Sequence, residues 1–203
     1  MEIKTLPVGG LGTNCYVLED GGRAALIDPG DEAGRILAQV ERDGVQVDYI
    51  LLTHGHYDHT TAVPELAAAL PQAKIYIHQS DANGAGSRLF PLAGRVDELL
   101  FYDEGDRLTV GGVTVRVLHT PGHSLGSVVL QADHVLFTGD TLFAGSCGRT
   151  DLPGGSYEQI LASLRRLAGL EGDFHVLPGH DVASTLERER QTNFYMKQAM
   201  SQS

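Results

Sequence analysis

The chain has 203 residues, of which 42% are hydrophobic and 20% are charged, and its formal net charge at pH 7 is -11. This length and composition are typical of a soluble globular protein with its own core, and we expect a single domain over residues 1–203. The acidic balance argues against binding to nucleic acid or to an anionic membrane surface.

The N-terminal half predicts a meander of short strands, followed by helices that alternate with strands. Apolar runs between glycine-rich turns predict strands at residues 3–6, 16–18, 24–27, 47–52 and 74–78. Apolar residues at helical spacing predict one helix that begins at Asp31 or Glu32 and ends at Gly44. A second helix is predicted over residues 62–70, and residues 80–103 predict only loops with short helical pieces.

The C-terminal half repeats this order of elements. It predicts strands at residues 108–110, 113–118, 128–130, 135–138 and 175–177. Ser156-x-x-Gln159 is a capping-box pattern in front of a helix, and Ser184-x-x-Glu187 predicts the start of a closing helix that runs to about Met200. The helices recur often enough to cover the outer faces of two sheets. The expected fold class is therefore α/β, a four-layer αββα sandwich.

Cysteine usage and the N-terminal residues both indicate a reducing compartment. Cys15 and Cys147 are too few for a disulfide framework, so we expect both thiols to be reduced. The first residues show no charged region followed by an apolar stretch, and no segment approaches the roughly 20 apolar residues of a membrane helix. We expect a cytoplasmic protein that binds neither membranes nor nucleic acid.

A cluster of histidines follows the fourth predicted strand, in the stretch Thr53-His54-Gly55-His56-Tyr57-Asp58-His59. His54 and His56 are two residues apart in a chain that we expect to be extended, so their imidazoles should point the same way and share one metal ion. Asp58 and His59 are adjacent and can turn toward a second position. The cluster thus predicts half of a metal site with two positions.

Three further donors each follow a predicted strand and a glycine: His123, Asp140 and His180. Glycine permits the sharp turn that presents each side chain at one edge of the sheets. Singly, a histidine in a turn is more often solvated than bound to a metal, and an aspartate after glycine often caps a helix. Together with the cluster, the three donors fit one site.

These motifs, in this order, resemble the metallo-β-lactamase superfamily. The resemblance also includes residues 13–18 and 25–30, and it covers nearly the whole chain. Within the superfamily, residues 139–149 look like the glyoxalase II branch, whose activity is hydroxyacylglutathione hydrolysis, and residues 150–155 are closest to its short, single-domain members. Longer members add a C-terminal helical domain that supplies glutathione contacts, which we do not expect in this chain.

The resemblance implies a paired-metal site that hydrolyses thioesters. It assigns His54, His56 and His123 to the first metal, Asp58, His59 and His180 to the second, and Asp140 to a bridging position. Such donors suit two divalent ions, with zinc expected and iron or manganese as alternatives. The implied reaction is attack of a metal-bound hydroxide on a small-molecule thioester of the S-2-hydroxyacyl-thiol type, with Asp58 as the catalytic residue that orients the water and handles its proton.

Two residues that follow Asp140 allow more than one interpretation. Arg149 occupies a place where the glyoxalase II branch carries a basic residue that contacts the glutathione carboxylate, but it is equally suited to a structural pair with Asp151. We expect Cys147 to pack rather than to act as a nucleophile. The remaining histidines match no ligand position of the family, and we expect surface or core roles for His78, His119, His134 and His175.

Other functions stay open at this stage. Persulfide dioxygenases share the implied fold and the motif at residues 147–151, and they would use a single iron on His54, His123 and Asp140. A lactonase, phosphodiesterase or other ester hydrolase of the same fold would apply the same hydroxide to another substrate. A non-enzymatic zinc module is disfavoured, because structural zinc sites are closed and usually rich in cysteine.

Overall fold

The first of two six-stranded sheets is built by the N-terminal half of the chain. A computed structural model describes residues 1–82 and 90–201. The strands of this sheet are, in spatial order, β1 (Glu2–Val8), β2 (Thr13–Asp20), β3 (Arg23–Ile27), β4 (Gln46–Leu51), β5 (Lys74–Ile77) and β6 (Leu100–Phe101). β1 to β3 pair antiparallel and β3 to β6 pair parallel. The predicted meander and its following strands are confirmed, whereas β6 was not predicted.

The second sheet comes from the C-terminal half. Its spatial order is β14 (Ser184–Thr185), β13 (His175–Pro178), β10 (Val135–Gly139), β9 (Val128–Ala132), β8 (Val113–His119) and β7 (Arg107–Val110). β7 to β10 pair antiparallel, and β13 lies parallel to β10. A separate two-stranded hairpin consists of β11 (Leu142–Phe143) and β12 (Ser146–Cys147).

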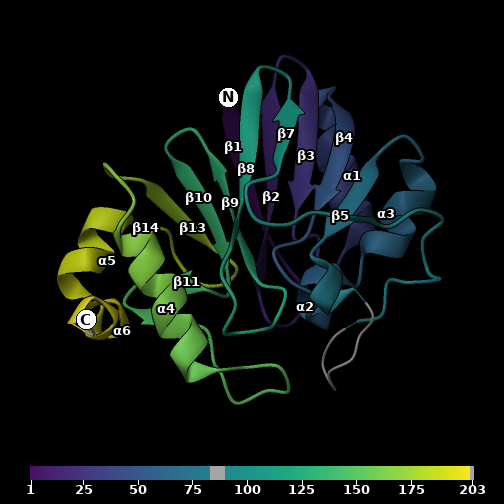
Figure 1. The fold of residues 1–203 in the computed structure, drawn as a ribbon. Helices are drawn as coiled ribbons and strands as arrows, with labels where there is room; N and C mark the ends of the chain where they lie inside the picture. The colour runs from purple at the N-terminus through teal and green to yellow at the C-terminus, as the bar shows by residue number, and fades with distance from the viewer. Residues whose placement is uncertain (83–89, 202–203) are drawn as a thin grey trace.

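Figure 1 shows the two sheets side by side with helices on their outer faces. Three clusters of buried apolar side chains hold these elements together. Between the sheets, Leu18 and Ile27 of the first sheet share one buried cluster with Val117 and Phe137 of the second. The outer face of the first sheet is covered by α1 (Ala33–Asp43) and α3 (Val63–Ala69). The outer face of the second is covered by α4 (Tyr157–Ala168), α5 (Leu186–Thr192) and α6 (Phe194–Ser201). This arrangement confirms the four-layer α/β sandwich.

The ends of the helices test the predicted caps. Gly44 ends α1 with φ of 65°, and the Ser156 hydroxyl accepts the Gln159 N–H at 3.3 Å at the start of α4, both as predicted. None of the helices in the described ranges combines the length and the apolar character that crossing a bilayer requires.

The prediction of a single closing helix capped by Ser184 is wrong. Thr185 is the cap, since its hydroxyl accepts the Arg188 N–H at 3.2 Å, and the helix divides at Asn193 into α5 and α6. The Asn193 side chain donates to the Ser146 carbonyl at 2.9 Å and accepts the Tyr195 N–H at 3.0 Å. It therefore anchors the break to the β11–β12 hairpin and starts the next helix, a role that helical periodicity does not reveal.

Candidate metal centre

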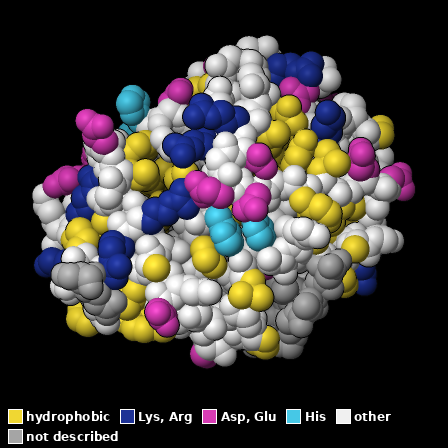
Figure 2. All heavy atoms as spheres, in the orientation of Figure 1, with side chains coloured by type: hydrophobic (Ala, Val, Ile, Leu, Met, Phe, Trp, Pro, Cys, Tyr) yellow, Lys and Arg dark blue, Asp and Glu magenta, His cyan; other side chains and the backbone are white. Residues whose placement is uncertain are grey.

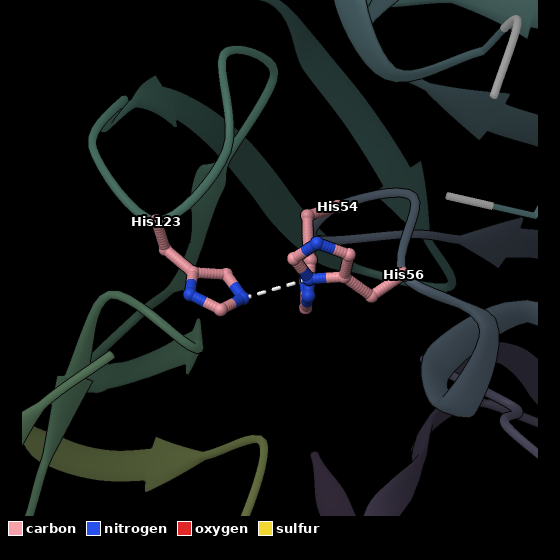
Figure 3. A group of neighbouring side chains, drawn as sticks. All are labelled: His54, His56 and His123. Carbon is pink, nitrogen blue, oxygen red and sulfur yellow. Dashed lines mark hydrogen bonds between the residues drawn. The ribbon is translucent and has the colours of Figure 1, made fainter. Parts of the chain in front are cut away.

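The seven predicted donors lie at the carboxyl ends of strands from both sheets. His54 and His56 follow β4, and Asp58 and His59 lie in the short helix α2 (Tyr57–Thr60). His123 follows β8, Asp140 follows β10 and His180 follows β13. In Figure 3 the imidazoles of His54, His56 and His123 point toward one another from two separate loops.

The expectation that residues 53–59 continue as an extended chain is wrong. β4 ends at Leu51, His54 lies in a bend, and the His59 N–H donates to the His56 carbonyl at 3.0 Å to open a helical turn. The turn places Asp58 and His59 beside His180. The pattern of apolar residues contains no sign of so short a helix, because four residues give too few positions for a period.

The first group of donors consists of His54, His56 and His123, whose donor nitrogens all lie within 4.8 Å of one another. All three residues are buried, and their rings cross at 79° to 87°. The His56 Nδ1 and His123 Nε2 atoms are 2.8 Å apart. Burial and the neighbouring imidazoles lower the pKa of His54 well below its usual value and that of His56 to about 4. Both side chains are therefore neutral at pH 7 and hold lone pairs for a cation.

The second group consists of Asp58, His59 and His180, which also offer donor atoms within 4.8 Å of one another. The His180 Nε2 atom lies 3.2 Å from Asp58 Oδ2 and 3.3 Å from His59 Nε2. Burial opposes the charge on Asp58, but the hydrogen bond from His180 keeps the pKa of Asp58 below its usual value. The carboxylate is thus anionic at neutral pH.

Asp140 faces both groups. Its Oδ2 lies 3.4 Å from His123 Nε2, and its Oδ1 lies 3.4 Å from His59 Nε2 and 3.7 Å from His180 Nε2. Burial raises the pKa of Asp140, but the imidazoles of His59 and His123 outweigh it and hold that pKa well below its usual value. Burial lowers the pKa of His59, whereas Asp140 and Asp28 raise it well above its usual value. In the absence of metal the two side chains therefore form a buried ion pair.

Two buried atoms show that these donors fit metal ions. Within the described residues, His54 Nε2 has no hydrogen-bond partner, and Asp140 Oδ1 has only the ion-pair contacts at 3.4 Å to His59 and 3.7 Å to His180, neither with hydrogen-bond geometry. Leaving a buried polar atom without a partner is unfavourable, and native proteins seldom do so. A cation beside each atom would satisfy it, and imidazole with carboxylate is a donor set that zinc, iron and manganese accept.

Partners behind the donors fix which nitrogen faces the centre. Asp28, buried and with φ of 50°, accepts the Thr53 N–H at 2.7 Å and lies 2.9 Å from His59 Nδ1. The His123 Nδ1 atom lies 2.8 Å from the Arg149 carbonyl, to which it donates. In both rings Nε2 remains for the centre, as is usual for metal-binding histidines. The sequence had assigned no role to Asp28; its only local signal was an aspartate between a strand and Pro-Gly.

The opening of the site is small. A cavity of about 160 Å³ is lined by Leu11, His56, Tyr57, Asp58, His123, Asp140, Arg149, Leu152 and His180. Arg149 thus lies at the opening, while its guanidinium also donates to both carboxylate oxygens of Asp151 at 2.7 Å. The structure contains both features that the two interpretations of Arg149 require.

Histidine side chains also reach the molecular surface, where acidic and basic side chains border them (Figure 2). One further group combines His78, Asp103 and His119. The rings of His78 and His119 stack at 4.4 Å and only 4° from parallel. Because an imidazole binds an ion in its own plane, two stacked rings cannot both direct a lone pair at one ion. The His78 Nδ1 atom also accepts the Ser80 N–H at 3.2 Å, so we assign this group a structural role.

The chain is similar to known proteins over most of its length. Residues 8–180 match the family described as the metallo-beta-lactamase superfamily. The hydroxyacylglutathione hydrolase GloC of Haemophilus influenzae is 32% identical over 97% of this chain and 98% of that protein.

Solved structures resemble the whole chain as well. The BLEG-1 B3 metallo-beta-lactamase has a TM-score of 0.85 at 34% identity, and the match covers 96% of this chain and 99% of that one. TTHA1623 in a di-iron-bound form has a TM-score of 0.82 at 37% identity, with coverage of 95% and 99%. ETHE1 from Myxococcus xanthus has a TM-score of 0.83 at 28% identity, with coverage of 99% and 91%.

Proposed function

The chain belongs to the metallo-β-lactamase superfamily, and we propose that it is a metal-dependent hydrolase of small thioesters of the S-2-hydroxyacyl-thiol type. The observation that carries the proposal is the position of Asp140, whose two oxygens face two separate groups of donors. The first group would hold one divalent ion and the second group another, with Asp140 between them. The likeness to a hydroxyacylglutathione hydrolase at 32% identity supports the choice of substrate class.

Two bound cations would lower the pKa of a shared water and polarise the carbonyl that this water attacks. Residues of the chain would orient this water. Asp58 is anionic and accepts a hydrogen bond from the Thr13 hydroxyl at 3.3 Å, which holds its carboxylate toward the centre. We infer that Asp58 orients the attacking water and receives its proton.

The cavity supports a small acyl group. A volume of about 160 Å³ is below the roughly 300–1,000 Å³ of pockets that enclose drug-sized ligands. The side chains of Leu11, Tyr57 and Leu152 line its wall. The acyl part of a thioester would lie in the cavity with its carbonyl at the donors, while the thiol part extends over the surface past Arg149.

Metal-loaded protein tests this function directly. We expect it to release thiol from S-lactoylglutathione, and we expect Asp58→Asn to remove most of that activity while Cys147→Ser retains it. The second variant is the control, because the Cys147 side chain packs against the apolar cluster between the second sheet and its helices. Protein that holds two ions per chain and hydrolyses no member of a panel of thioesters would refute the proposal; lactones and a β-lactam belong in the same panel.

A second candidate is oxygenation of a persulfide by a single iron. ETHE1, at 28% identity and a TM-score of 0.83, favours it, as does the motif at residues 147–151. Against it stands the completeness of the second group, in which Asp58, His59 and His180 already face one another. Oxygen uptake with glutathione persulfide, together with one iron per chain, would select this candidate over hydrolysis.

A further inference from the structure

A buried aspartate that no metal-ligand motif includes joins the two loops of the first donor group. Asp81 ends the short 3-10 helix η1 (Gln79–Asp81) after β5, and it is 1% exposed. Its Oδ2 accepts the Gly55 N–H at 2.9 Å and the Ser124 hydroxyl at 2.6 Å. Its Oδ1 accepts the Gly126 N–H at 2.8 Å.

The groups that donate hydrogen bonds to Asp81 lie next to candidate metal ligands in the chain. Gly55 stands between His54 and His56, and Ser124 follows His123. One carboxylate therefore links the backbone between two ligands to the loop that carries the third. The Gly55 carbonyl also accepts the Phe90 N–H at 2.9 Å, so both backbone groups of Gly55 are fixed.

The fit around Asp81 is close, and its partners are neutral. A Cβ atom added at Gly126 would lie 2.7 Å from Asp81 Cγ, so only glycine permits this approach. Across residues 1–82 and 90–201, no ion pair involves Asp81. A buried carboxylate is retained only when hydrogen bonds satisfy it, and here those bonds come from the two ligand loops.

We propose that Asp81 is a positioning residue for the metal ion of His54, His56 and His123. These loops extend from β4 and β8, which belong to different sheets. The Val128 N–H donates to the Thr53 carbonyl at 2.8 Å and joins the two segments at their base. Asp81 joins the same two loops beside the histidines themselves, through Gly55 and Ser124. It thereby sets the separation of the three donor nitrogens.

Other residues hold the second donor group, so the effect of Asp81 is selective. Asp28 orients His59, and the Asn14 side chain donates to the carbonyls of Pro178 and Asp181 at 3.0 Å, which flank His180 in the chain. None of these contacts involves Asp81. The inference rests on the metal centre of the proposed function but not on its substrate.

Glu189 offers a matched control for a substitution at Asp81. It is also a fully buried carboxylate, and it accepts hydrogen bonds from Gly145 N–H, the Asn193 side chain and the Ser184 hydroxyl. These residues belong to neither loop of the first donor group. In each variant the carboxylate becomes an amide of the same shape. In Asp81→Asn the new NH₂ group must face a backbone N–H at either position, whereas in Glu189→Gln it can donate to the Ser184 hydroxyl.

The experiment measures zinc affinity by competition with a chromophoric chelator in the full-length wild type, Asp81→Asn, Glu189→Gln and His56→Ala. The last variant identifies which of the two binding steps belongs to the first donor group. We expect Asp81→Asn to weaken that step by about 10–100-fold, the range typical for residues that orient metal ligands. The other step should change by no more than a few-fold, and Glu189→Gln should retain both affinities while its ion-free melting temperature falls.

Wild-type affinity of Asp81→Asn at both steps would overturn the proposal, as would an equal loss at both steps that Glu189→Gln reproduces. If Asp81→Asn does not fold, Ser124→Ala removes one of the three hydrogen bonds and should weaken the same step to a smaller extent; an unchanged affinity there would also overturn it. Protein that binds two ions with this dependence on Asp81 but cleaves no thioester would refute the proposed function alone.

Discussion

The backbone at Gly30 lies so close to the histidine cluster that we expect one added methyl group there to disturb the metal centre. A Cβ atom added at Gly30 would lie 1.6 Å from the Asp58 carbonyl oxygen and 3.3 Å from His59 Cα, whereas ordinary contact begins at 3.4 Å. Gly30→Ala must therefore move the Asp58 backbone by about 1.8 Å, against a tolerance of about 0.2 Å in metal–ligand distances. Overpacking of this kind lowers the free energy of unfolding by about 1–3 kcal/mol.

The assay combines zinc content per chain with thermal unfolding of the ion-free protein. We expect Gly30→Ala to lose zinc from the second donor group and to melt roughly 2–12 °C lower, since 1 kcal/mol shifts a chain of this length by about 2–4 °C. Gly34→Ala in α1 is the matched control: its added Cβ would have no atom within 4 Å, and the helix should gain about 0.5–1 kcal/mol. If Gly30→Ala binds two zinc ions and melts like the wild type, the steric reasoning is wrong.

Three further predictions concern the surroundings of the centre. Burial raises the pKa of the Cys147 thiol to about 11, so mass spectrometry should show iodoacetamide alkylation at pH 8 far slower than for free cysteine; fast alkylation would contradict its burial. The raised pKa values of His59 and His180 favour protonated imidazoles near pH 7, so zinc binding should release at least one proton, and fewer in Asp28→Asn; a binding enthalpy that does not depend on the ionisation enthalpy of the buffer would exclude this. Asp151→Asn should free Arg149 and lower the KM for thioesters that carry a carboxylate at constant kcat, whereas an unchanged KM would make the pair structural.

Elements with a clear period were predictable from the sequence, because burial of one face imposes that period. The meander, α1 and α4 were predicted within a few residues. The two-residue strands β6, β11, β12 and β14 were not, since two residues are too few to show an alternating period. The break at Asn193 was missed for a different reason: its partners in the β11–β12 hairpin lie 47 and 50 residues away.

Some residues of the candidate site were likewise predictable from the sequence, and others were not. The donors could be found because their residue types and their places after strands are local features of the sequence. Asp28 and Asp81 could not, because an aspartate beside a strand or a short helix looks like an ordinary turn or cap residue. Their hydrogen-bond partners among the ligand loops lie 25 to 45 residues along the chain. Only the folded chain reveals that these carboxylates accept hydrogen bonds from the ligands or from their loops.

The division of the donors between the two sheets has a consequence for the stability of the whole fold. His54, His56, Asp58 and His59 extend from the first sheet, and the others from the second, so an ion bound by either group together with Asp140 would join both halves of the sandwich. Ions that bind only the folded chain add to its free energy of unfolding, by about 4 kcal/mol at a free concentration of 1,000 times Kd. Bound ions would thus also serve as removable cross-links, and metal supply in the cell would set how firmly the two sheets stay together.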